Sequence, residues 1–434
     1  MAQWSDLTKE LLPNNKTIYE VVKIAGTNGG AASSGNPLPV SFGSMNTDAF
    51  GRLRVSNPVT LYDSFHRYSD NGKDAVYTNG TASSSYNANT SSVLMSIGQD
   101  AGDAVYRESK RVFAYQPGKS LEIFMTFNFG VQKEGLRNRV GYFGDHNGVF
   151  LQREGAIASI VKRTSISGVV QDIAIAQQDW NVDTLDGTGP SGFALDLSKS
   201  QILFIDIEWL GVGAVRCGFV IDGLFVHCHT FVHANIIETT YMTTAMLPVR
   251  HEIENISNTD SASTHTEICT SVISEGGYEV AGKPRSFIMP VNAPKTLAVI
   301  GQLYPIITLR LKADKLDAIS VLRDISILGI GNNTRIVWKL MYAPTITGGT
   351  WNTTGTDSSV EYSTDCTYSG GEAVASGILS VTNQSTSVMS LDHGSFKYQL
   401  ERNSFTEQPI CLTLVAQGLT NGDAVLAGVV WEEI

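Results

Sequence analysis

The chain has 434 residues, which is long enough for two or three domains with separate hydrophobic cores. Its hydrophobic content of 42% excludes wholesale disorder, and its 41 glycines favour a turn-rich β protein over a helical one. A formal net charge of −11 argues against a nucleic-acid-binding surface, because neutralising phosphates requires concentrated Lys and Arg.

Residues 1–45 are predicted to form an N-terminal arm. A short amphipathic piece at residues 7–12 and one candidate strand at residues 17–24 precede GTNGGAASSGNPLP, a segment too rich in small and polar residues to bury a core. Arms of this kind often become ordered only against a neighbouring subunit, so the arm predicts oligomerisation; a disordered tail is the alternative.

No stretch of signal-peptide character opens the chain, and no later stretch approaches the length of a membrane span. The five cysteines (Cys217, Cys228, Cys269, Cys366, Cys411) form no CxxC pair and no regular spacing, which indicates reduced and mostly buried thiols. A disulfide between Cys217 and Cys228, across a hairpin, is the alternative. We therefore expect a soluble protein that is made in a cytoplasm and is not inserted into a membrane.

Residues 46–290 are predicted to form an antiparallel β-sandwich of the jelly-roll or lectin-like kind. Short strands separated by turns recur along this region, and in residues 121–129 the apolar positions alternate with mixed ones, as on a half-buried strand. The expected strands here include residues 93–97, 108–115, 120–129, 140–143, 148–153 and 157–164. Regular short strands of this kind are typical of a sandwich or jelly roll.

Residues 201–235, QILFIDIEWLGVGAVRCGFVIDGLFVHCHTFVHAN, are predicted to be an antiparallel β-ribbon. Gly211 and Gly213 mark a turn, and Asp222-Gly223 is flanked by the apolar runs 215–221 and 224–231. An Asp-Gly pair between such runs is the strongest short-range signal for a tight hairpin.

Residues 291–434 are predicted to form a second, smaller β-sandwich. Strand-like runs occur at residues 295–311, 334–343, 408–416 and 424–431. Residues 317–329 fit either a helix or a strand, and the near period-two recurrence of Ile, Val and Leu favours the strand. Residues 345–371 are rich in Gly, Thr and Ser and are predicted to be an exposed loop. The fold class is therefore all-β, with an N-terminal arm before two sandwiches.

The candidate metal ligands are His227, His229 and His233, in the segment HCHTFVH. On a strand, His227 and His229 project to the same side and His233 lies just beyond them, so three imidazoles would be close enough to hold Zn²⁺. No Asp or Glu lies within the segment to orient the rings, and a structural or interfacial role for the histidines is the favoured alternative.

Asp206 and Glu208 are a candidate carboxylate pair for glycoside hydrolysis, with a solvent-facing charged strand as the favoured alternative. GxSxG, HExxH and GxxxxGK[ST] are absent from the sequence. GTGPSG at residues 187–192 matches GxGxxG by letter but lacks a strand-to-helix context, and DNGKD at residues 70–74 has fewer carboxylates than a calcium loop of the EF-hand type. The sequence thus predicts no enzyme, no catalytic residues and no cofactor.

Residues 46–255 contain, in order, the blocks NTDAFGRLRVSNPVTLYDS, RNRVGYFGDHNGVFLQREG, IEWLGVGAVRCGFVIDGLFVHCHTFVHAN and YMTTAMLPVRHEIEN. Together these blocks resemble a family of structural proteins of tailed-bacteriophage virions. The resemblance implies a virion component assembled in the host cytoplasm, in a tail fibre, a baseplate, a collar or a head decoration. It implies other virion proteins and further copies of this chain as partners; a glycan-binding module that recognises a cell surface is the alternative.

Overall fold

The computed structural model describes residues 8–11, 18–21, 56–277, 279, 282–331, 334–380, 387–390 and 399–434. The chain divides into two compact units, residues 1–56 and residues 57–434. In the first unit β1 (Thr8–Leu11) pairs antiparallel with β2 (Ile18–Val21). The predicted strand at residues 17–24 therefore contains β2, and the amphipathic piece at residues 7–12 contains β1. The other residues of the predicted arm (1–45) lie outside the described residues.

The predicted fold class is confirmed, because the described part of the chain is built from antiparallel sheets. The first sandwich has a seven-stranded sheet with the order β12-β11-β10-β9-β16-β7-β4. Its strands are β4 (Asp74–Asn79), β7 (Ala104–Ser109), β9 (Leu136–Phe143), β10 (Gly148–Glu154), β11 (Ile157–Thr164), β12 (Gln171–Ala176) and β16 (Val249–Asn255).

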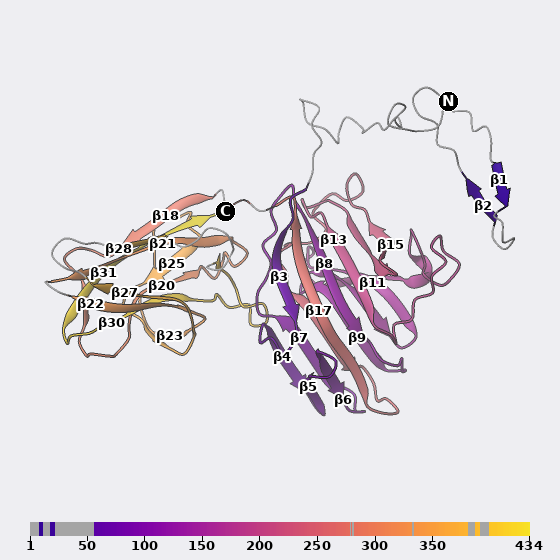
Figure 1. Ribbon diagram of the computed structural model, residues 1–434, viewed down its shortest axis with the longest axis horizontal. Coiled ribbons are helices and arrows are strands. Elements are labelled where there is room, and N and C mark those ends of the chain that lie inside the picture. The colour runs from indigo at the N-terminus through magenta and orange to yellow at the C-terminus, as the bar shows by residue number, and fades with distance from the viewer. Residues whose placement is uncertain are drawn as a thin grey trace, which may run out of the picture. The chain divides into compact units, whose positions relative to one another are not determined.

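The second layer of this sandwich is an eight-stranded sheet with the order β15-β14-β13-β8-β17-β6-β5, in which β3 also pairs with β17. Its strands are β3 (Val59–Phe65), β5 (Ala82–Asn87), β6 (Ser92–Ile97), β8 (Ser120–Asn128), β13 (Gln201–Ile207), β14 (Val215–Ile221), β15 (Leu224–Phe231) and β17 (Ser263–Glu275). In Figure 1 strands β3, β17, β8 and β13 run side by side.

Period-two alternation places the core between these two sheets. Leu121, Ile123, Met125 and Phe127 of β8 are buried, whereas the residues between them are only partly so. They join a large apolar cluster that also includes Tyr142 of β9 and Phe219 of β14. Each strand therefore contributes alternate side chains to the interior, as expected for a sheet with one buried face.

The predicted hairpin is confirmed at its turn. Asp222 and Gly223 have φ angles of 51° and 77°, so both central residues adopt the left-handed conformation of a tight two-residue hairpin loop. β14 and β15 flank the pair and hydrogen-bond in the register Ile221↔Leu224.

The second sandwich has two six-stranded sheets. The first comprises β18 (Lys283–Ile288), β19 (Lys295–Leu297), β21 (Ser320–Ile330), β28 (Ser387–Ser390), β29 (Gln399–Leu400) and β31 (Asp423–Glu433). The second comprises β20 (Tyr304–Leu311), β22 (Arg335–Tyr342), β24 (Asn352–Thr353), β25 (Val360–Ser363), β27 (Glu372–Ser380) and β30 (Leu412–Gly418). A separate apolar cluster, with the fully buried Trp431, fills the space between them.

Two sequence-based expectations for individual elements were wrong, and one open choice is settled. The expected strand at residues 108–115 ends at Ser109, after which Val112 and Phe113 are buried without strand pairing. The expected loop 345–371 contains short strands, β23 (Thr345–Thr347) and β26 (Thr367–Ser369) among them, which pair with each other. Their short length and polar composition hid them from a periodicity argument. Residues 320–330 form β21, so the strand reading there was right.

Within residues 57–434 the two sandwiches share an interface. The guanidinium of Arg111 pairs with the buried carboxylate of Glu401 at 2.9 Å, and the Ser404 hydroxyl donates to the carbonyl of Ser109 at 2.5 Å. Val112, Ala114 and Met246 of the first sandwich pack with Ile319 and Val321 of the second. The interface is therefore an apolar contact flanked by polar contacts.

The predicted division at residues 290 and 291 stays a prediction. β18 ends at Ile288 and pairs with β31, so it already belongs to a sheet of the second sandwich.

All five cysteines are free. In the register of β14 and β15, Cys217 lies opposite His229 and not opposite Cys228. Among the described residues no helix has the length and apolar character needed to cross a membrane.

Candidate functional site

The three histidines predicted as metal ligands lie on or just after β15, and each has its own hydrogen-bond partner. His227 Nε2 lies 2.9 Å from the Thr230 hydroxyl, and His229 Nδ1 accepts from the backbone N–H of Asn181 at 3.3 Å. The ring of His233 donates through Nδ1 to the carbonyl of Gly213 at 2.6 Å, and its Nε2 accepts from the Lys162 ammonium at 2.8 Å.

Within the described residues, these three histidines do not bring one nitrogen each within 4.8 Å of one another. Burial lowers the pKa of each imidazole, which keeps the rings neutral near pH 7. His233 also stacks on Tyr241 with ring centroids 4.0 Å apart. Each ring is thus held by hydrogen bonds to its own neighbours, and the metal-ligand prediction for these histidines stays a prediction.

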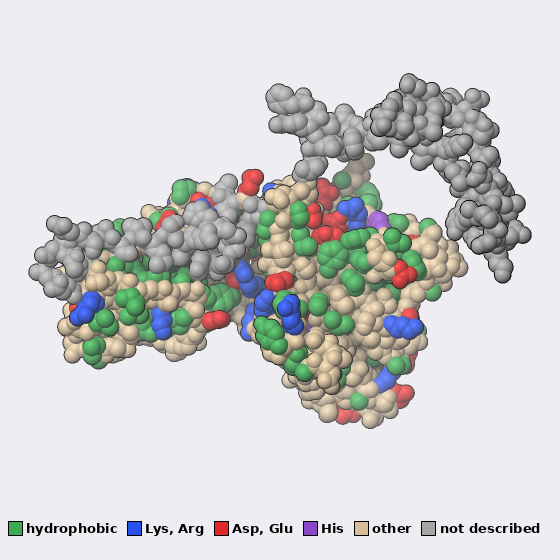
Figure 2. All heavy atoms as spheres, viewed as in Figure 1, with side chains coloured by type: hydrophobic (Ala, Val, Ile, Leu, Met, Phe, Trp, Pro, Cys, Tyr) green, Lys and Arg blue, Asp and Glu red, His purple; other side chains and the backbone are tan. Residues whose placement is uncertain are grey.

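The outer face of the eight-stranded sheet carries an aromatic cluster that the sequence analysis did not single out. Phe124 of β8 lies opposite Phe204 of β13, and Phe225 of β15 covers both, with ring centroids 5.9 and 5.3 Å away. Phe225 is 60% exposed. In Figure 2 hydrophobic side chains gather over β8, β13 and β15, with acidic and basic side chains beside them.

Gly218 makes this cluster possible. It lies opposite Phe204 in the register of β13 and β14, and a Cβ atom there would come within 2.6 Å of the Phe204 ring and 2.2 Å of the Val226 carbonyl. Any larger residue at this position would push the ring away from the sheet. We call this surface the aromatic face. It consists of the phenyl rings of Phe124, Phe204 and Phe225, together with Gly218 beneath them.

A row of charged residues borders the aromatic face. Asp206 of β13 lies opposite Glu122 on one side and Arg216 on the other, and its carboxylate forms an ion pair with Arg216. Burial, followed by the nearby Glu275 and Asp206, raises the pKa of Glu122 above its usual value. Glu208, the other predicted carboxylate, is exposed beyond the end of β13. Asp206 is therefore held by an arginine, as a surface charge would be.

The GTGPSG segment is a loop closed by aspartate side chains. The two carboxylate oxygens of Asp183 accept from the backbone N–H groups of Leu185 and Ser191, at 2.9 and 2.8 Å. These side-chain to backbone bonds are typical of turns, and the loop does not open a helix, which a dinucleotide-binding motif requires.

A buried charged network, also missed by the sequence analysis, lies between the two sheets of the first sandwich. Arg107 is 1% exposed, and its guanidinium contacts Glu267 at 2.6 Å, Asp74 at 3.1 Å and Asp70 at 3.0 Å. His66 Nε2 lies 3.2 Å from a Glu267 oxygen. We call this set of side chains the buried network; its members are His66, Asp70, Asp74, Arg107 and Glu267.

A β-bulge directly follows Glu267. The pairing of β17 with β8 shifts register between Glu267 and Cys269, so that Glu267 is buried in phase with Ser263 and His265, whereas Thr270 and Val272 are the buried residues after the shift. β3 ends with Phe65 opposite Cys269, which places His66 beside Glu267. Asp74 and Arg107 come from β4 and β7 of the other sheet. The network therefore links the two layers.

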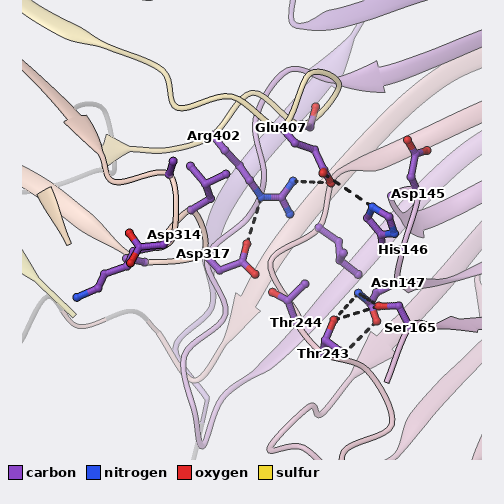
Figure 3. A pocket seen from close by; sticks show the side chains of 17 residues that line it. Asp145, His146, Asn147, Ser165, Thr243, Thr244, Asp314, Asp317, Arg402 and Glu407 are labelled. Carbon is purple, nitrogen blue, oxygen red and sulfur yellow. Dashed lines mark hydrogen bonds and ion pairs between the residues drawn. The ribbon is translucent and has the colours of Figure 1, made fainter. Parts of the chain in front are cut away.

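A shallow cavity of about 450 Å³ lies between the two sandwiches and is shown in Figure 3. The guanidinium of Arg402 lines this cavity and is fixed by hydrogen bonds. Nε donates to Asp317 at 3.1 Å, and Nη2 donates to the carbonyl of Met246 at 3.0 Å. Glu407 lies 3.9 Å from both Arg402 and His146 (Figure 3). These groups bind one another across the interface between the two sandwiches. We therefore interpret the cavity as a gap in that interface and not as a ligand site.

The chain is thus a two-sandwich, all-β protein with paired internal charges and an aromatic outer face. No family model and no curated protein matches it. Among solved structures it is similar to the CBM2 module of the evolved Dit protein of Lactobacillus casei BL23 phage J-1. That match has 7% identity and a TM-score of 0.35, and covers 52% of this chain and 100% of the module.

Two further solved structures are similar to part of the chain. A β-glucanase of Bacillus licheniformis has 12% identity and a TM-score of 0.31, covering 52% of this chain and 99% of the enzyme. A legume lectin-like domain of Entamoeba histolytica has 11% identity and a TM-score of 0.30, covering 51% and 99% of the two chains. At such identities and TM-scores these likenesses do not bear on function.

Proposed function

We propose that this chain is a structural component of a tailed-phage virion, which assembles into a symmetric oligomer on the tail and docks through its N-terminal arm. The alternative position in the particle is on the head, where the chain would be a capsid decoration protein. Both variants require neighbouring proteins as partners and require no catalysis.

The observation that carries the proposal is the distribution of charged and apolar groups in the first sandwich. Arg107 pairs with acidic side chains between the sheets, and Asp206 pairs with Arg216 on the outside. By contrast, the aromatic face presents Phe225 to solvent on the edge strand β15 itself. An exposed apolar face on a sheet edge suits contact with another protein.

The phage resemblance supports the same proposal through the positions of its blocks. Residues 137–155 span most of β9 and all of β10 in the seven-stranded sheet, and residues 207–235 span β14 and β15 in the eight-stranded sheet. The block that ends at Asn255 contains β16. The resembling residues thus build the sandwich itself, so the resemblance concerns the scaffold rather than an appended loop.

Deleting residues 1–40 is expected to leave the two sandwiches folded while the shortened chain fails to enter particles. Residues 57–434 form a compact unit without that segment, and an arm contributes binding energy only where a neighbour receives it. Particles assembled with the shortened or the full-length chain would be purified and their protein content compared by mass spectrometry. Thermal unfolding of the purified shortened chain is the control for folding. Normal incorporation of the shortened chain would refute arm docking.

A second candidate function is recognition of a cell-surface glycan by the aromatic face. The specific observation is that Phe225 exposes its ring on the sheet face that also carries Glu122, Asp206 and Arg216. These three residues lie two positions along their strands from Phe124, Phe204 and Gly218 and supply hydrogen-bonding groups beside an apolar surface. A sugar ring presents one apolar face and a rim of hydroxyls, and the two sets of groups are complementary.

The purified full-length chain would be applied to a glycan array together with its Phe225→Ala variant. Loss of a contact worth about 1.4 kcal/mol is expected to weaken binding of any recognised glycan roughly tenfold. Phe405→Ala is the matched control, because Phe405 is 36% exposed and lies in the second sandwich. Equal binding by all three proteins, or binding by none, would remove the aromatic face as a glycan site.

A further inference from the structure

Arg107 binds one oxygen of each of the two buried carboxylates, Asp74 and Glu267. The second oxygen of each carboxylate contacts a different side chain. Arg107 donates to Oε2 of Glu267 and to Oδ2 of Asp74. Oε1 of Glu267 lies 3.2 Å from His66 Nε2, and Oδ1 of Asp74 accepts from the Tyr62 hydroxyl at 3.1 Å. One ligand atom each from His66, Asp74 and Glu267 lies within 4.8 Å of the other two.

These distances are compatible with a common metal ion. Metal–nitrogen and metal–oxygen bonds in proteins are about 2.0–2.2 Å long, so two adjacent ligands on one ion lie roughly 3 Å apart. The separation between His66 Nε2 and Glu267 Oε1 is 3.2 Å. Arg107 then occupies the position of an outer partner, which fixes the orientation of both carboxylates through their remaining oxygens.

The charge of the buried network favours a cation. Asp70, Asp74 and Glu267 carry −3 when ionised and Arg107 carries +1, which leaves −2 with a neutral imidazole. Asp74 and Glu267 are at most 5% exposed, and uncompensated charge at such depth is costly. One divalent ion would supply the missing charge.

His66 provides a second and independent indication. Its side chain is fully buried, and its Nδ1 atom has no hydrogen-bond partner. Oδ1 of Asp70 lies 3.9 Å from Nδ1, and Asp70 is the member of the network that reaches solvent, with 41% of its side chain exposed. A metal-bound imidazole commonly directs its other nitrogen to such a carboxylate.

We propose that His66, Asp74 and Glu267 bind one divalent transition-metal ion, Zn²⁺ or Mn²⁺, with Arg107 and Asp70 as its outer partners. The imidazole ligand selects these ions over Ca²⁺ and Mg²⁺, which prefer oxygen donors alone. The ion would tie β3 and β17 of one sheet to β4 of the other, and its role would be structural. The DNGKD segment at residues 70–74 then contributes to a metal site, although one of a different kind from a calcium loop.

The test uses the full-length chain, treated with EDTA, dialysed and titrated with Zn²⁺, Mn²⁺ or Ca²⁺ in a calorimeter. Saturable binding of one Zn²⁺ or Mn²⁺ per chain is expected, together with a higher melting temperature in the presence of the ion. Asp74→Asn is expected to weaken binding at least tenfold, because it removes a charged ligand and because loss of even an outer partner of a metal site costs about 10–100-fold. Asp206→Asn is the matched control and should bind as the unmodified chain does, since Asp206 lies on the outer face.

Absence of saturable binding, or equal binding by Asp74→Asn, would overturn the proposal. Should Asp74→Asn fail to fold, the unmodified chain labelled with ¹⁵N-histidine decides the question by NMR. Zn²⁺ must then shift the ring-nitrogen signals of His66 and leave those of the exposed His146 in place. Signals of His66 that do not respond to the ion would equally exclude the site.

Discussion

Replacing Arg107 by methionine is expected to lower the free energy of unfolding by about 3–5 kcal/mol, because removing one partner of a buried ion network leaves the others uncompensated. Arg107 makes contacts of 2.6–3.1 Å with three carboxylates, two of them at most 5% exposed. Methionine fills similar space without charge, so the change tests the ionic contacts rather than a cavity. Urea-induced unfolding of the EDTA-treated chain, followed by circular dichroism, measures the difference.

Arg216→Met is the matched control for this prediction. Arg216 also pairs with an aspartate on a strand of the first sandwich, but its side chain is 61% exposed. Exposed ion pairs are screened by solvent, and the control should cost no more than about 1 kcal/mol. The double change Arg107→Met with Glu267→Leu should cost less than the sum of the two single changes, since each charge removed relieves the other. Similar losses for Arg107→Met and Arg216→Met would show that the buried network does not stabilise the sandwich.

Replacing Trp431 by alanine is expected to destabilise the second sandwich by about 3–5 kcal/mol, the usual cost of removing a large aromatic side chain from a core. Trp431 is fully buried in the central strand β31, and its indole N–H donates to Glu433 at 2.8 Å. Because β31 pairs with β18, β19 and β21, the loss should spread through that sheet. Hydrogen exchange measured by mass spectrometry locates the loss along the chain.

The same experiment tests the predicted division into two sandwich domains. The two sandwiches have separate large cores, and Trp431 belongs to the second. Amides of β21 and β31 should therefore lose protection while those of β8 and β13 keep most of theirs. Trp351→Ala is the control, because Trp351 is half-buried and its main contact is the Arg310 guanidinium 3.7 Å above its ring, a contact worth about 0.5–1 kcal/mol. Equal loss of protection in both sandwiches would mean that the chain unfolds as one domain.

The sequence determined the fold class through local patterns. Alternating apolar residues in positions 121–129 are sufficient to predict a half-buried strand, and Asp222-Gly223 is sufficient to predict a hairpin, because both depend on neighbouring residues only. The same reasoning overextended the strand at residues 108–115, where Val112 and Phe113 are buried by the tertiary fold without strand pairing. It also missed β23 and β26, which are too short and too polar to show a period.

The tertiary structure alone decided where the charged groups lie. Glu267 and Arg107 are 160 residues apart, and no local pattern relates them. A register shift directly after Glu267 reverses the alternation of β17, so that Glu267 shares the interior with His265 before the shift and Val272 is buried after it. The aromatic face likewise depends on register, since Phe204 covers Gly218 only because β13 and β14 pair at those positions. Strand content follows from short-range periodicity, whereas register and bulges follow from pairing between distant strands.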